Sequence, residues 1–378
     1  MNLLIHDLNE NEWSRIADKY KGWEIISDNG TIKPCAGCFG CWFKTPGQCV
    51  IRDEYNRMGE LIHKADEMVV ISRYTYGGFS SFVKNVFDRS ISWMLPYFEV
   101  YEGEMHHKQR YPEEKPVTFI FRADAITADE KEKAKIYVEA VCRNFRGRIR
   151  DLVFEQCAPL PISPREEEPD EPCDPRKTVL LNGSLRGDAS NSRRFLSVLA
   201  GKLEGEPEIV NLSVTCRDEQ AETLLSAGTV VLGMPLYVDG IPSQVLRIME
   251  KLAERPGSRK KIYVVANMGF YESRQIRNLL SMVKDWCDQC GYDYCGGLAV
   301  GAGEMMGRVM APKGPARNVM NGLDQLAAAV NTAAKTEDIY ADAHWFPRFL
   351  YILAAHLGWS KAAKMNGLKK KDLFRRWE

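Results

Sequence analysis

The segment from Leu181 to Ser192 has the residue types best suited to binding a ligand. It reads Leu-Asn-Gly-Ser-Leu-Arg-Gly-Asp-Ala-Ser-Asn-Ser, follows an apolar run at Val179–Leu181 and precedes a helical pattern at Arg193–Leu203. A strand, a turn rich in glycine and serine, and a helix start together present backbone N–H groups to a phosphate. Its spacing matches neither Gly-x-x-x-x-Gly-Lys-Ser/Thr nor Gly-x-Gly-x-x-Gly, which weakens a nucleoside-triphosphate or dinucleotide assignment. Donor side chains are added by Ser184, Arg186, Ser190, Asn191 and Ser192.

Two further loops follow expected strands, at Met234–Pro242 and Ala266–Glu272. In such loops proline stiffens a turn, tyrosine offers a flat face and glycine lets the backbone approach a ligand closely. Each loop taken alone is also ordinary turn chemistry, but all three occur in order. The candidate contact residues are Pro235, Leu236, Tyr237, Val238, Asp239, Gly240, Asn267, Met268, Gly269 and Phe270.

Taken together, the three loops resemble those of the flavodoxin-like NAD(P)H-dependent FMN reductases. The segment Met234–Pro242 resembles that family's Pro-x-Tyr-x-x-x-x-Pro element beside the isoalloxazine ring. The resemblance implies a bound FMN whose phosphate lies in the first loop, and NAD(P)H as co-substrate. It also implies that backbone N–H groups of the other two loops contact the N5, O4 and O2 edge of the ring.

A segment rich in proline and acids, residues 158–176, divides the chain and cannot form a helix interior. On either side the sequence repeats itself, because Ala65–Ile71 aligns with Ala227–Gly233 at a constant offset of 162. The same offset relates Gly78 to Gly240, which favours a duplication over two generic units. We therefore predict a domain at 1–157, a linker at 158–176, a second domain at 177–336 and a tail at 337–378.

Both halves alternate strand and helix patterns. In the first half we expect strands at Asn2–His6, Trp23–Ser27, Met68–Ser72 and Val117–Ala123, and helices at Glu10–Tyr20, Glu54–Lys64, Ser80–Met94 and Ala128–Phe145. In the second half we expect strands at Thr178–Asn182, Glu208–Asn211, Thr229–Gly233, Ile262–Ala266 and Leu298–Gly301, and helices at Arg193–Leu203, Glu219–Ser226, Pro242–Ala253 and Ser273–Cys290. Such alternation indicates parallel sheets covered on both faces. The predicted fold class is α/β: two tandem flavodoxin-like doubly wound parallel sheets, a pseudo-dimer, with a C-terminal helical tail.

The first half departs from the family pattern in two ways. After its first strand come Asp7, Glu10 and Glu12 instead of glycine and serine, and these acids would repel a phosphate. We therefore expect no FMN in the usual position of the first half. Related reductases are typically homodimers in which each flavin also touches the neighbouring subunit, so a fused pseudo-dimer would let the first half cap the flavin of the second. The capping candidates are Arg73, Tyr74, Tyr76 and Trp42.

The cysteines Cys35, Cys38, Cys41 and Cys49 have a spacing that resembles the compact cluster motif of iron–sulfur flavoproteins. Four thiolates on one glycine-containing loop suit a 4Fe–4S cluster, and zinc is a second option. The alternative is that these cysteines pack near the flavin without any metal. The later group Cys287, Cys290 and Cys295 has no nearby histidine and is expected to be buried and apolar.

The composition describes a globular protein of the reducing cytoplasm. Eleven cysteines occur without a signal peptide or a long apolar span, and 51 basic residues balance 51 acidic ones, so no global field favours nucleic acid. The polar segment with His106 and His107 is expected to be a solvated loop. The tail, residues 344–378, has seven aromatic and eight basic residues against two acids. We expect it to cover the domains or make a homodimer contact rather than bind a membrane.

The sequence therefore predicts an FMN-dependent oxidoreductase that takes hydride from NAD(P)H and reduces a small flat acceptor or a redox protein. No protein nucleophile is expected, because the flavin carries the chemistry. The main alternative is an iron–sulfur flavoprotein that transfers electrons through a 4Fe–4S cluster on the Cys35–Cys49 loop. A third alternative, a flavin-free interaction module, conflicts with the glycine- and serine-rich loop at Leu181–Ser192.

Overall fold

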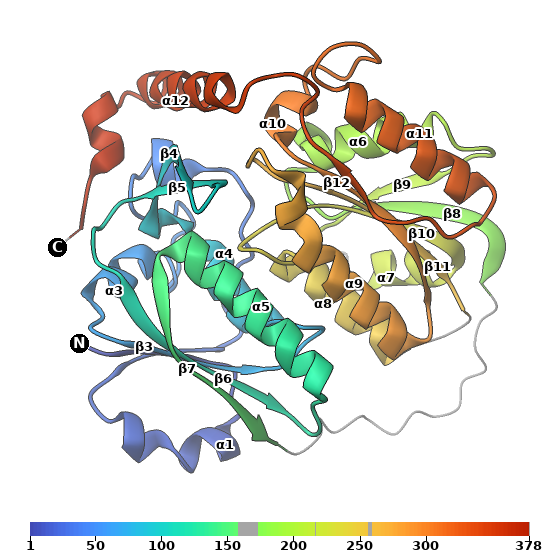
Figure 1. Cartoon of the computed structure of the whole chain (residues 1–378). Coiled ribbons are helices and arrows are strands. Elements are labelled where there is room, and N and C mark those ends of the chain that lie inside the picture. Colours follow the sequence, from blue (N-terminus) through green and yellow to red (C-terminus); the bar gives the residue numbers. More distant parts are fainter. Residues whose placement is uncertain (158–172, 216, 256–258, 378) are drawn as a thin grey trace. The chain divides into compact units, whose positions relative to one another are not determined.

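The computed structural model describes residues 1–157, 173–215, 217–255 and 259–377, and these residues form two compact units (Figure 1). The first unit comprises the described residues within Met1–Tyr101, His106–Ser163 and Ile352–Glu378. The second comprises those within Glu102–Met105 and Pro164–Tyr351. Most of the predicted linker lies outside the described residues, but its last residues, Asp174–Arg176, belong to strand β8 rather than to a connector.

The first unit is built on a five-stranded parallel sheet with the order β2-β1-β3-β6-β7. In chain order within the unit this is 2-1-3-4-5, the flavodoxin-like arrangement, with its switch point between β1 and β3. The strands are β1 (Leu3–His6), β2 (Glu24–Ser27), β3 (Met68–Arg73), β6 (Lys115–Ala123) and β7 (Gly147–Gln156).

The remaining elements of the first unit include most of a two-stranded sheet inserted between α4 and β6, whose residues Glu102–Met105 belong to the second unit. Its strands β4 (Met94–Tyr101) and β5 (Glu104–Gln109) are joined by a two-residue turn at Glu102 and Gly103, both with positive φ. The helices are α1 (Glu10–Ser14), η1 (Ala17–Tyr20), α2 (Gly40–Phe43), α3 (Met58–Lys64), α4 (Ser81–Arg89), η2 (Ile91–Trp93), α5 (Ala128–Phe145) and η5 (Lys370–Phe374).

The second unit is built on a six-stranded parallel sheet with the order β13-β12-β11-β10-β8-β9. Counted within the unit, the order is 2-1-3-4-5-6, which repeats that of the first unit and adds one edge strand. The strands are β8 (Asp174–Asn182), β9 (Glu208–Asn211), β10 (Ala227–Pro235), β11 (Lys261–Asn267), β12 (Asp293–Val300) and β13 (Ile339–Ala341). The two flavodoxin-like doubly wound α/β sheets predicted from the sequence are thus confirmed.

Helices flank this second sheet (Figure 1). They are η3 (Gly187–Ala189), α6 (Asn191–Ala200), α7 (Arg217–Leu225), α8 (Ser243–Glu254), η4 (Ser273–Ile276), α9 (Arg277–Cys290), α10 (Gly303–Met306) and α11 (Arg317–Asn331). The last long helix of the chain, α12 (Arg348–Met365), contains the boundary between the two units, at Tyr351 and Ile352.

The repeat inferred from the sequence is reproduced in the structure. Strand β3 ends at Arg73 and β10 at Pro235, and helices α4 and α8 begin at Ser81 and Ser243, so both pairs keep the offset of 162. Between strand and helix, each copy has the same four-residue turn, closed by the bridges Thr75–Gly78 and Tyr237–Gly240.

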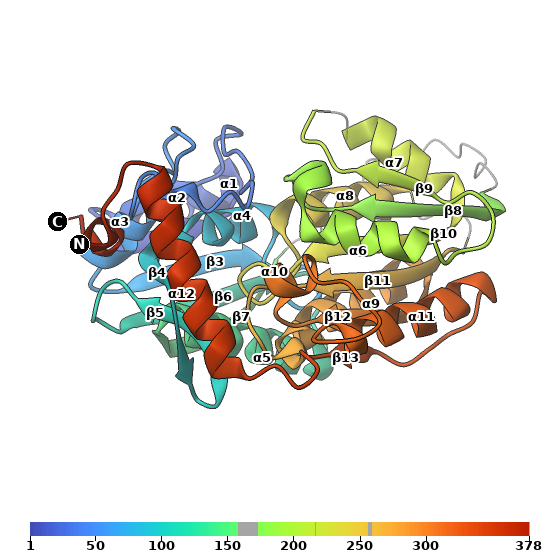
Figure 2. The same cartoon turned by 90° about the horizontal axis from the view of Figure 1, so that it is seen from above.

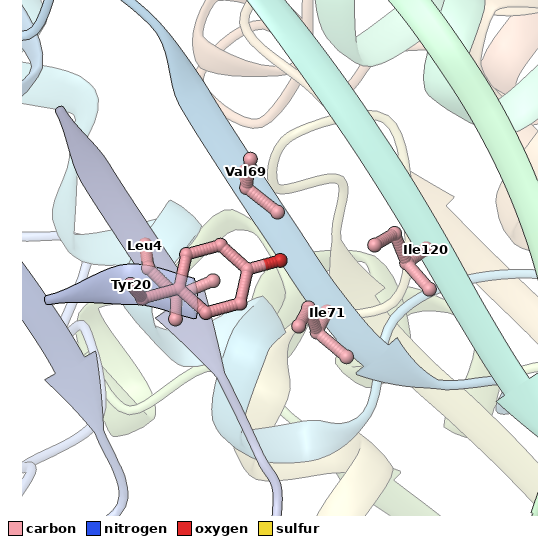
Figure 3. Close-up of a cluster of buried hydrophobic side chains, with 5 residues drawn as sticks. All are labelled: Leu4, Tyr20, Val69, Ile71 and Ile120. Atoms are coloured by element: carbon pink, nitrogen blue, oxygen red, sulfur yellow. The ribbon is translucent and has the colours of Figure 1, made fainter. Parts of the chain in front are cut away.

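Burial of aliphatic strand residues holds each sheet to its helices. In the first unit, Leu4 of β1, Val69 and Ile71 of β3 and Ile120 of β6 pack with Tyr20 of η1 (Figure 3). Each large side chain of this kind contributes roughly 1.5–3 kcal/mol when it leaves water. The core therefore fixes the strands whose carboxyl ends carry the candidate site residues.

Several sequence expectations differ from the structure. The predicted helix Glu10–Tyr20 is two short helices, α1 and η1, and Ser80–Met94 ends as a helix at Arg89. The supposed solvated loop with His106 and His107 is strand β5, where His106 is buried. The predicted tail contains β13, the edge strand of the second sheet. Strand β7 and helix α11 escaped prediction.

Candidate functional site

The loop between β8 and α6 leaves donors open at the start of a helix. Ser190 is the N-cap of α6, and its Oγ accepts a hydrogen bond from the Arg193 N–H at 3.1 Å while its carbonyl accepts from the Arg194 N–H at 3.3 Å. The N–H groups of Asn191 and Ser192, in the first turn, have no acceptor within the helix. With the partial positive charge of the helix N-terminus, these donors favour an anion.

The same loop is held in shape by the buried Asn182, the last residue of β8. Its Nδ2 donates to the Gly187 carbonyl at 3.1 Å and to Asn211 Oδ1 at 2.9 Å. Its Oδ1 accepts from the Ser184 N–H and the Ser190 hydroxyl, both at 3.3 Å. Because both Nδ2 and Oδ1 of Asn182 form hydrogen bonds within the chain, the loop is ordered without a ligand.

Asn267, the last residue of β11, joins the three predicted loops. Its Nδ2 donates to Ser192 Oγ of the first loop at 2.8 Å and to the Met234 carbonyl, at the start of the second loop, at 3.2 Å. Its carbonyl accepts from the Leu236 N–H at 2.8 Å. The side chain is 5% exposed, so loss of any of these bonds would leave a buried polar group without a partner. The structure thus brings the three loops together at one edge of the sheet.

The second loop is a tight turn with unusual backbone angles. Tyr237 and Gly240 exchange two backbone hydrogen bonds of 3.2 and 3.0 Å, and the central residues Val238 and Asp239 have φ of 40° and 58°. The left-handed region is sparsely populated by branched residues and costs about 1–3 kcal/mol. Such strain gathers at binding sites, where the surrounding structure holds it in place.

A fourth loop, after β12, belongs to the same edge and was missed by the sequence analysis. The Ala302 N–H donates to the Phe270 carbonyl at 2.6 Å, and the Gly303 N–H donates to the Met268 carbonyl at 2.7 Å. The signal was present, because Gly301-Ala302-Gly303 follows a strand that was predicted. In a parallel sheet the carboxyl end of that strand must lie at the same edge.

Two predicted contact residues are already engaged within the second unit. Arg186, the proposed phosphate fork, forms an ion pair with Glu304 of the fourth loop at 3.3 Å, and both side chains are about one third exposed (36% and 37%). The carbonyl of Gly269 accepts from the Tyr351 hydroxyl at 2.8 Å. Arg186 therefore has to exchange a carboxylate partner for any bound phosphate.

The first unit closes the equivalent edge with its own side chains. The Asp7 N–H donates to the Ile71 carbonyl, as the Gly183 N–H donates to the Gly233 carbonyl in the second unit, so Asp7 corresponds to Gly183. Asp7 Oδ2 accepts from the Arg73 N–H at 2.9 Å. Burial raises the pKa of this carboxyl, although its hydrogen bonds to Ser80 and Arg73 oppose the rise.

The loop after β1 is bonded to its own side chains. The Leu8 N–H donates to His6 Nδ1 at 3.2 Å, and Asn9 and Glu12 form a reciprocal capping box at the start of α1. Burial lowers the pKa of His6 to about 4. Burial raises the pKa of Glu12, but its pairing with Arg122 at 2.9 Å and its bond from the Asn9 N–H together lower that pKa below its ordinary value. The edge is thus acidic and internally bonded.

The four capping candidates lie in the first unit, and Trp42 does not meet the requirement of an open ring face. Its indole is 1% exposed, stacks on Phe39 and meets Trp359 edge-on, and its Nε1 donates to the Met94 carbonyl at 3.0 Å. Its role is packing, which corrects the capping expectation for this residue. Arg73 and Tyr74 are half-buried at the end of β3, and Tyr76 is buried in the turn that corresponds to Tyr237–Gly240.

The cysteines Cys35, Cys38, Cys41 and Cys49 lie close enough to influence one another. Burial, together with the neighbouring Asp88, Cys49 and Cys38, raises the pKa of Cys35 to about 12. Burial likewise raises the pKa of Cys41, with Cys35, Cys49 and Cys38 adding to the effect. Arg89 Nε donates to Cys49 Sγ at 3.1 Å. Within the described residues, no group of three or more His, Cys, Asp or Glu is arranged to hold a metal ion.

The C-terminal segment of the first unit is bonded to the cysteine-rich loop and to the β4–β5 sheet. The buried Arg110 donates through Nη1 to the carbonyls of Leu373 and Arg375 at 2.7 and 2.8 Å. Trp377 Nε1 donates to the Pro46 carbonyl at 2.8 Å. Burial lowers the pKa of Arg110 to about 10. In the second unit, Cys287, Cys290 and Cys295 are buried, as the sequence indicated.

No helix in the described part of the chain is long and apolar enough to span a membrane. No protein-family model matches the chain, and no curated protein matches its sequence. Three solved structures resemble part of it, and the fold assignment above rests on strand order. The Trp repressor binding protein from Bacillus subtilis is 19% identical, with a TM-score of 0.27, over 32% of this chain and 82% of that one. The azoreductase AzrA is 14% identical, with a TM-score of 0.31, over 41% of this chain and 99% of its own. An azoreductase from Bacillus anthracis str. Sterne is 15% identical, with a TM-score of 0.30 and the same coverages.

Proposed function

We propose that the second unit binds FMN and that the protein is an oxidoreductase that takes hydride from NAD(P)H. The observation that carries the proposal is the Asn267 side chain, which ties the start of α6 to the loop after β10. This junction lies at the switch point between β8 and β10, where doubly wound sheets bind ligands. FMN, when bound, supplies the hydride chemistry, and the chain's residues bind and orient it.

The residues present fit the phosphate and the ribityl chain of FMN. The N–H groups of Asn191 and Ser192 and the hydroxyl of Ser184 supply neutral donors for an anion. Gln244 adds a second observation, because its Nε2 donates to the Gly183 carbonyl at 3.1 Å while its buried Oε1 has no partner. A ligand rich in hydroxyl groups would supply a donor of the kind that this oxygen lacks.

The remaining loops suit the flat ring system. Tyr237 offers an aromatic face beside a turn whose strained backbone is held by two hydrogen bonds. The third loop contributes backbone from Met268 to Phe270, and Gly269 is exposed there, with open space where a side chain would stand. Backbone donors near the pyrimidine edge of the ring would stabilise negative charge that develops there. No side-chain nucleophile is required.

The test is to quantify flavin on the purified protein and to follow its loss in matched variants. We expect one FMN per chain and FMN-dependent oxidation of NADH or NADPH. Ser190→Ala removes the N-cap of α6, and Thr127→Ala removes the N-cap of α5 in the first unit. Each should cost about 1 kcal/mol of stability, but only Ser190→Ala should weaken FMN binding, by roughly tenfold. A chain that takes up no FMN, or two FMN, would refute the assignment.

A second candidate function is electron transfer through a 4Fe–4S cluster on the Cys35–Cys49 loop. It is favoured by Arg89, whose Nε lies 3.1 Å from Cys49 Sγ, since a positive charge stabilises a thiolate ligand. Iron and labile sulfide, measured on anaerobically purified protein, separate the two candidates. About four irons per chain would establish the cluster, whereas FMN with negligible iron would leave these cysteines a packing role.

A further inference from the structure

Helix α12 has apolar residues on both of its faces, and only one face is covered by the protein. On the covered side, Tyr351 and Ala363 are buried, and His356 Nε2 accepts a hydrogen bond from the Phe98 N–H at 2.8 Å. Trp359 packs there against Phe39, Phe43 and Trp42. On this side each residue packs into its own unit: Tyr351 into the second, and His356, Trp359 and Ala363 into the first.

The opposite face forms an exposed apolar line. Phe349, Leu353 and Leu357 recur every four residues and are 68%, 54% and 65% exposed. The line continues through the exposed Lys361 to Met365, which is 77% exposed. Figure 2 shows α12 as one continuous red helix. Side chains four positions apart share one face of a helix. A helix that is apolar all round is normally buried, so this face lacks a partner within the described chain.

Trp345, just before α12, adds a strained aromatic residue to the same end. It is 67% exposed and has φ of 52°, in the left-handed region that is costly for a residue with a bulky side chain. Nothing is gained in water by holding a tryptophan in this way. Tryptophan is, however, enriched where an apolar phase meets water, because its ring is apolar and its N–H is polar.

The residues that follow the apolar line are strongly basic. Lys361, Lys364, Lys369–Lys371, Arg375 and Arg376 are exposed, and among the described residues from His344 onward the only acid is Asp372. Asp372 is already bonded to the backbone N–H of Lys369 at 2.7 Å. Because the whole chain is formally neutral, the rest of the protein is net acidic. Positive charge is therefore concentrated in α12 and the segment after it, although the net charge of the whole chain is zero.

We propose that the exposed face of α12 and the basic segment after it bind the surface of an anionic lipid membrane. The apolar line enters the boundary between headgroups and acyl chains, while the lysines and arginines contact acidic headgroups. A second copy of this chain is disfavoured, because it would bring two basic segments toward one another without acids to pair them. The proposal reverses the expectation from the sequence and does not depend on the proposed flavin chemistry.

The test is flotation of the full chain with phosphatidylcholine vesicles, with or without phosphatidylglycerol. We expect binding to the anionic vesicles alone, and release at high salt because screening weakens the headgroup contacts. The double variant L353E/L357E should lower the bound fraction by at least about tenfold, and K370E/K371E should abolish the preference for anionic lipid. The control V153E/V214E changes two exposed valines elsewhere and should bind normally.

Wild-type protein supplies a measurement that needs no charged variant. Lipid carrying a nitroxide near its headgroup should quench part of the tryptophan fluorescence, and Trp345→Phe should remove that part. Equal binding of L353E/L357E and wild type would overturn the proposal, as would absence of vesicle binding. Light scattering tests whether a second copy of the chain covers this face. A wild-type dimer that the L353E/L357E substitutions dissociate, together with no binding to vesicles, would assign the face to a second copy.

Discussion

The loops that follow β1, β3 and β6 in the first unit differ in chemistry from those that follow the equivalent strands β8, β10 and β11 in the second. In both, a tight turn follows the third strand of the unit and a backbone N–H from the first loop bonds to that strand, at Asp7–Ile71 and Gly183–Gly233. From β1 to the N-cap of α1 there are two residues, and from β8 to the N-cap of α6 there are seven. The longer loop carries neutral serine and asparagine side chains, whereas the shorter loop and the helix start after it carry the acids Asp7, Glu10 and Glu12.

A second difference lies one strand further along the sheet. The Tyr74 N–H bonds to the Arg122 carbonyl as the Leu236 N–H bonds to the Asn267 carbonyl, so Arg122 and Asn267 are equivalent. Arg122 turns to Glu12 and Glu155, while Asn267 turns to Ser192 and the Met234 carbonyl. A binding edge on this fold thus depends on neutral side chains that join loops without consuming the helix donors.

The largest effect is expected when the second unit receives the residue of the first. In Gly183→Asp, the new Cβ would lie 2.5 Å from Val245 Cγ2, and the carboxylate would add a negative charge to the loop proposed to hold the phosphate. We expect complete loss of FMN binding and a stability loss of about 1–3 kcal/mol from overpacking. The amount of FMN released from the protein measures the loss of binding, and the urea midpoint measures the loss of stability. Gly183→Ala separates them, since it keeps the crowding and omits the charge; FMN retained in Gly183→Asp would break the comparison.

An intermediate effect is expected at the equivalent pair Asn267 and Arg122. Asn267→Ala leaves Ser192 Oγ and the Met234 carbonyl without their donor, so it should cost roughly 1–3 kcal/mol and weaken FMN binding at least tenfold. Arg122→Ala removes an ion pair of the first unit and should cost less than about 1 kcal/mol. Calorimetric titration with FMN measures the affinity of each variant. Equal affinities of the two variants would show that Asn267 does not organise the site.

The smallest effect concerns the pH dependence of the first unit. Burial raises the pKa of Asp7 in the folded state above its ordinary value of 3.8, so between these two pKa values the folded chain binds more protons than the unfolded one. The free energy of unfolding therefore falls as pH rises through that window, and the penalty is fully present above the folded pKa. Asp7→Asn should stabilise the protein at neutral pH, and the difference should vanish near pH 3. Urea denaturation across that range tests the sign; a variant destabilised at neutral pH would contradict it.

The sequence was sufficient to predict the fold class, because buried parallel strands are near-continuous apolar runs and helices have their own period. It also located three loops that the structure joins through Asn267, since strand ends in a parallel sheet share an edge. Strand β7 was missed because exposed charged residues alternate with its apolar ones. Strand β13 was missed because it is only three residues long.

Other features depend on contacts distant in sequence. The pseudo-dimer interpretation makes Trp42 a candidate to cap the flavin, but Trp359, far along the chain, packs edge-on against its ring. Arg186 was expected to be available, and Glu304 of an unpredicted loop pairs with it. His106 was expected in water because its neighbours are polar, yet β5 buries it. In each case the partner that decides the role could not be read from local composition.

The contact of Arg110 with the C-terminal segment has a consequence for biosynthesis. The Arg375 carbonyl that Arg110 binds is 265 residues further along the chain. At about 5–20 residues per second, a ribosome takes roughly ten seconds to one minute to make that stretch. Domains generally fold in the order of synthesis. Here the cysteine-rich loop waits for Arg375 and Trp377 to emerge, so the first unit is the later of the two to be completed.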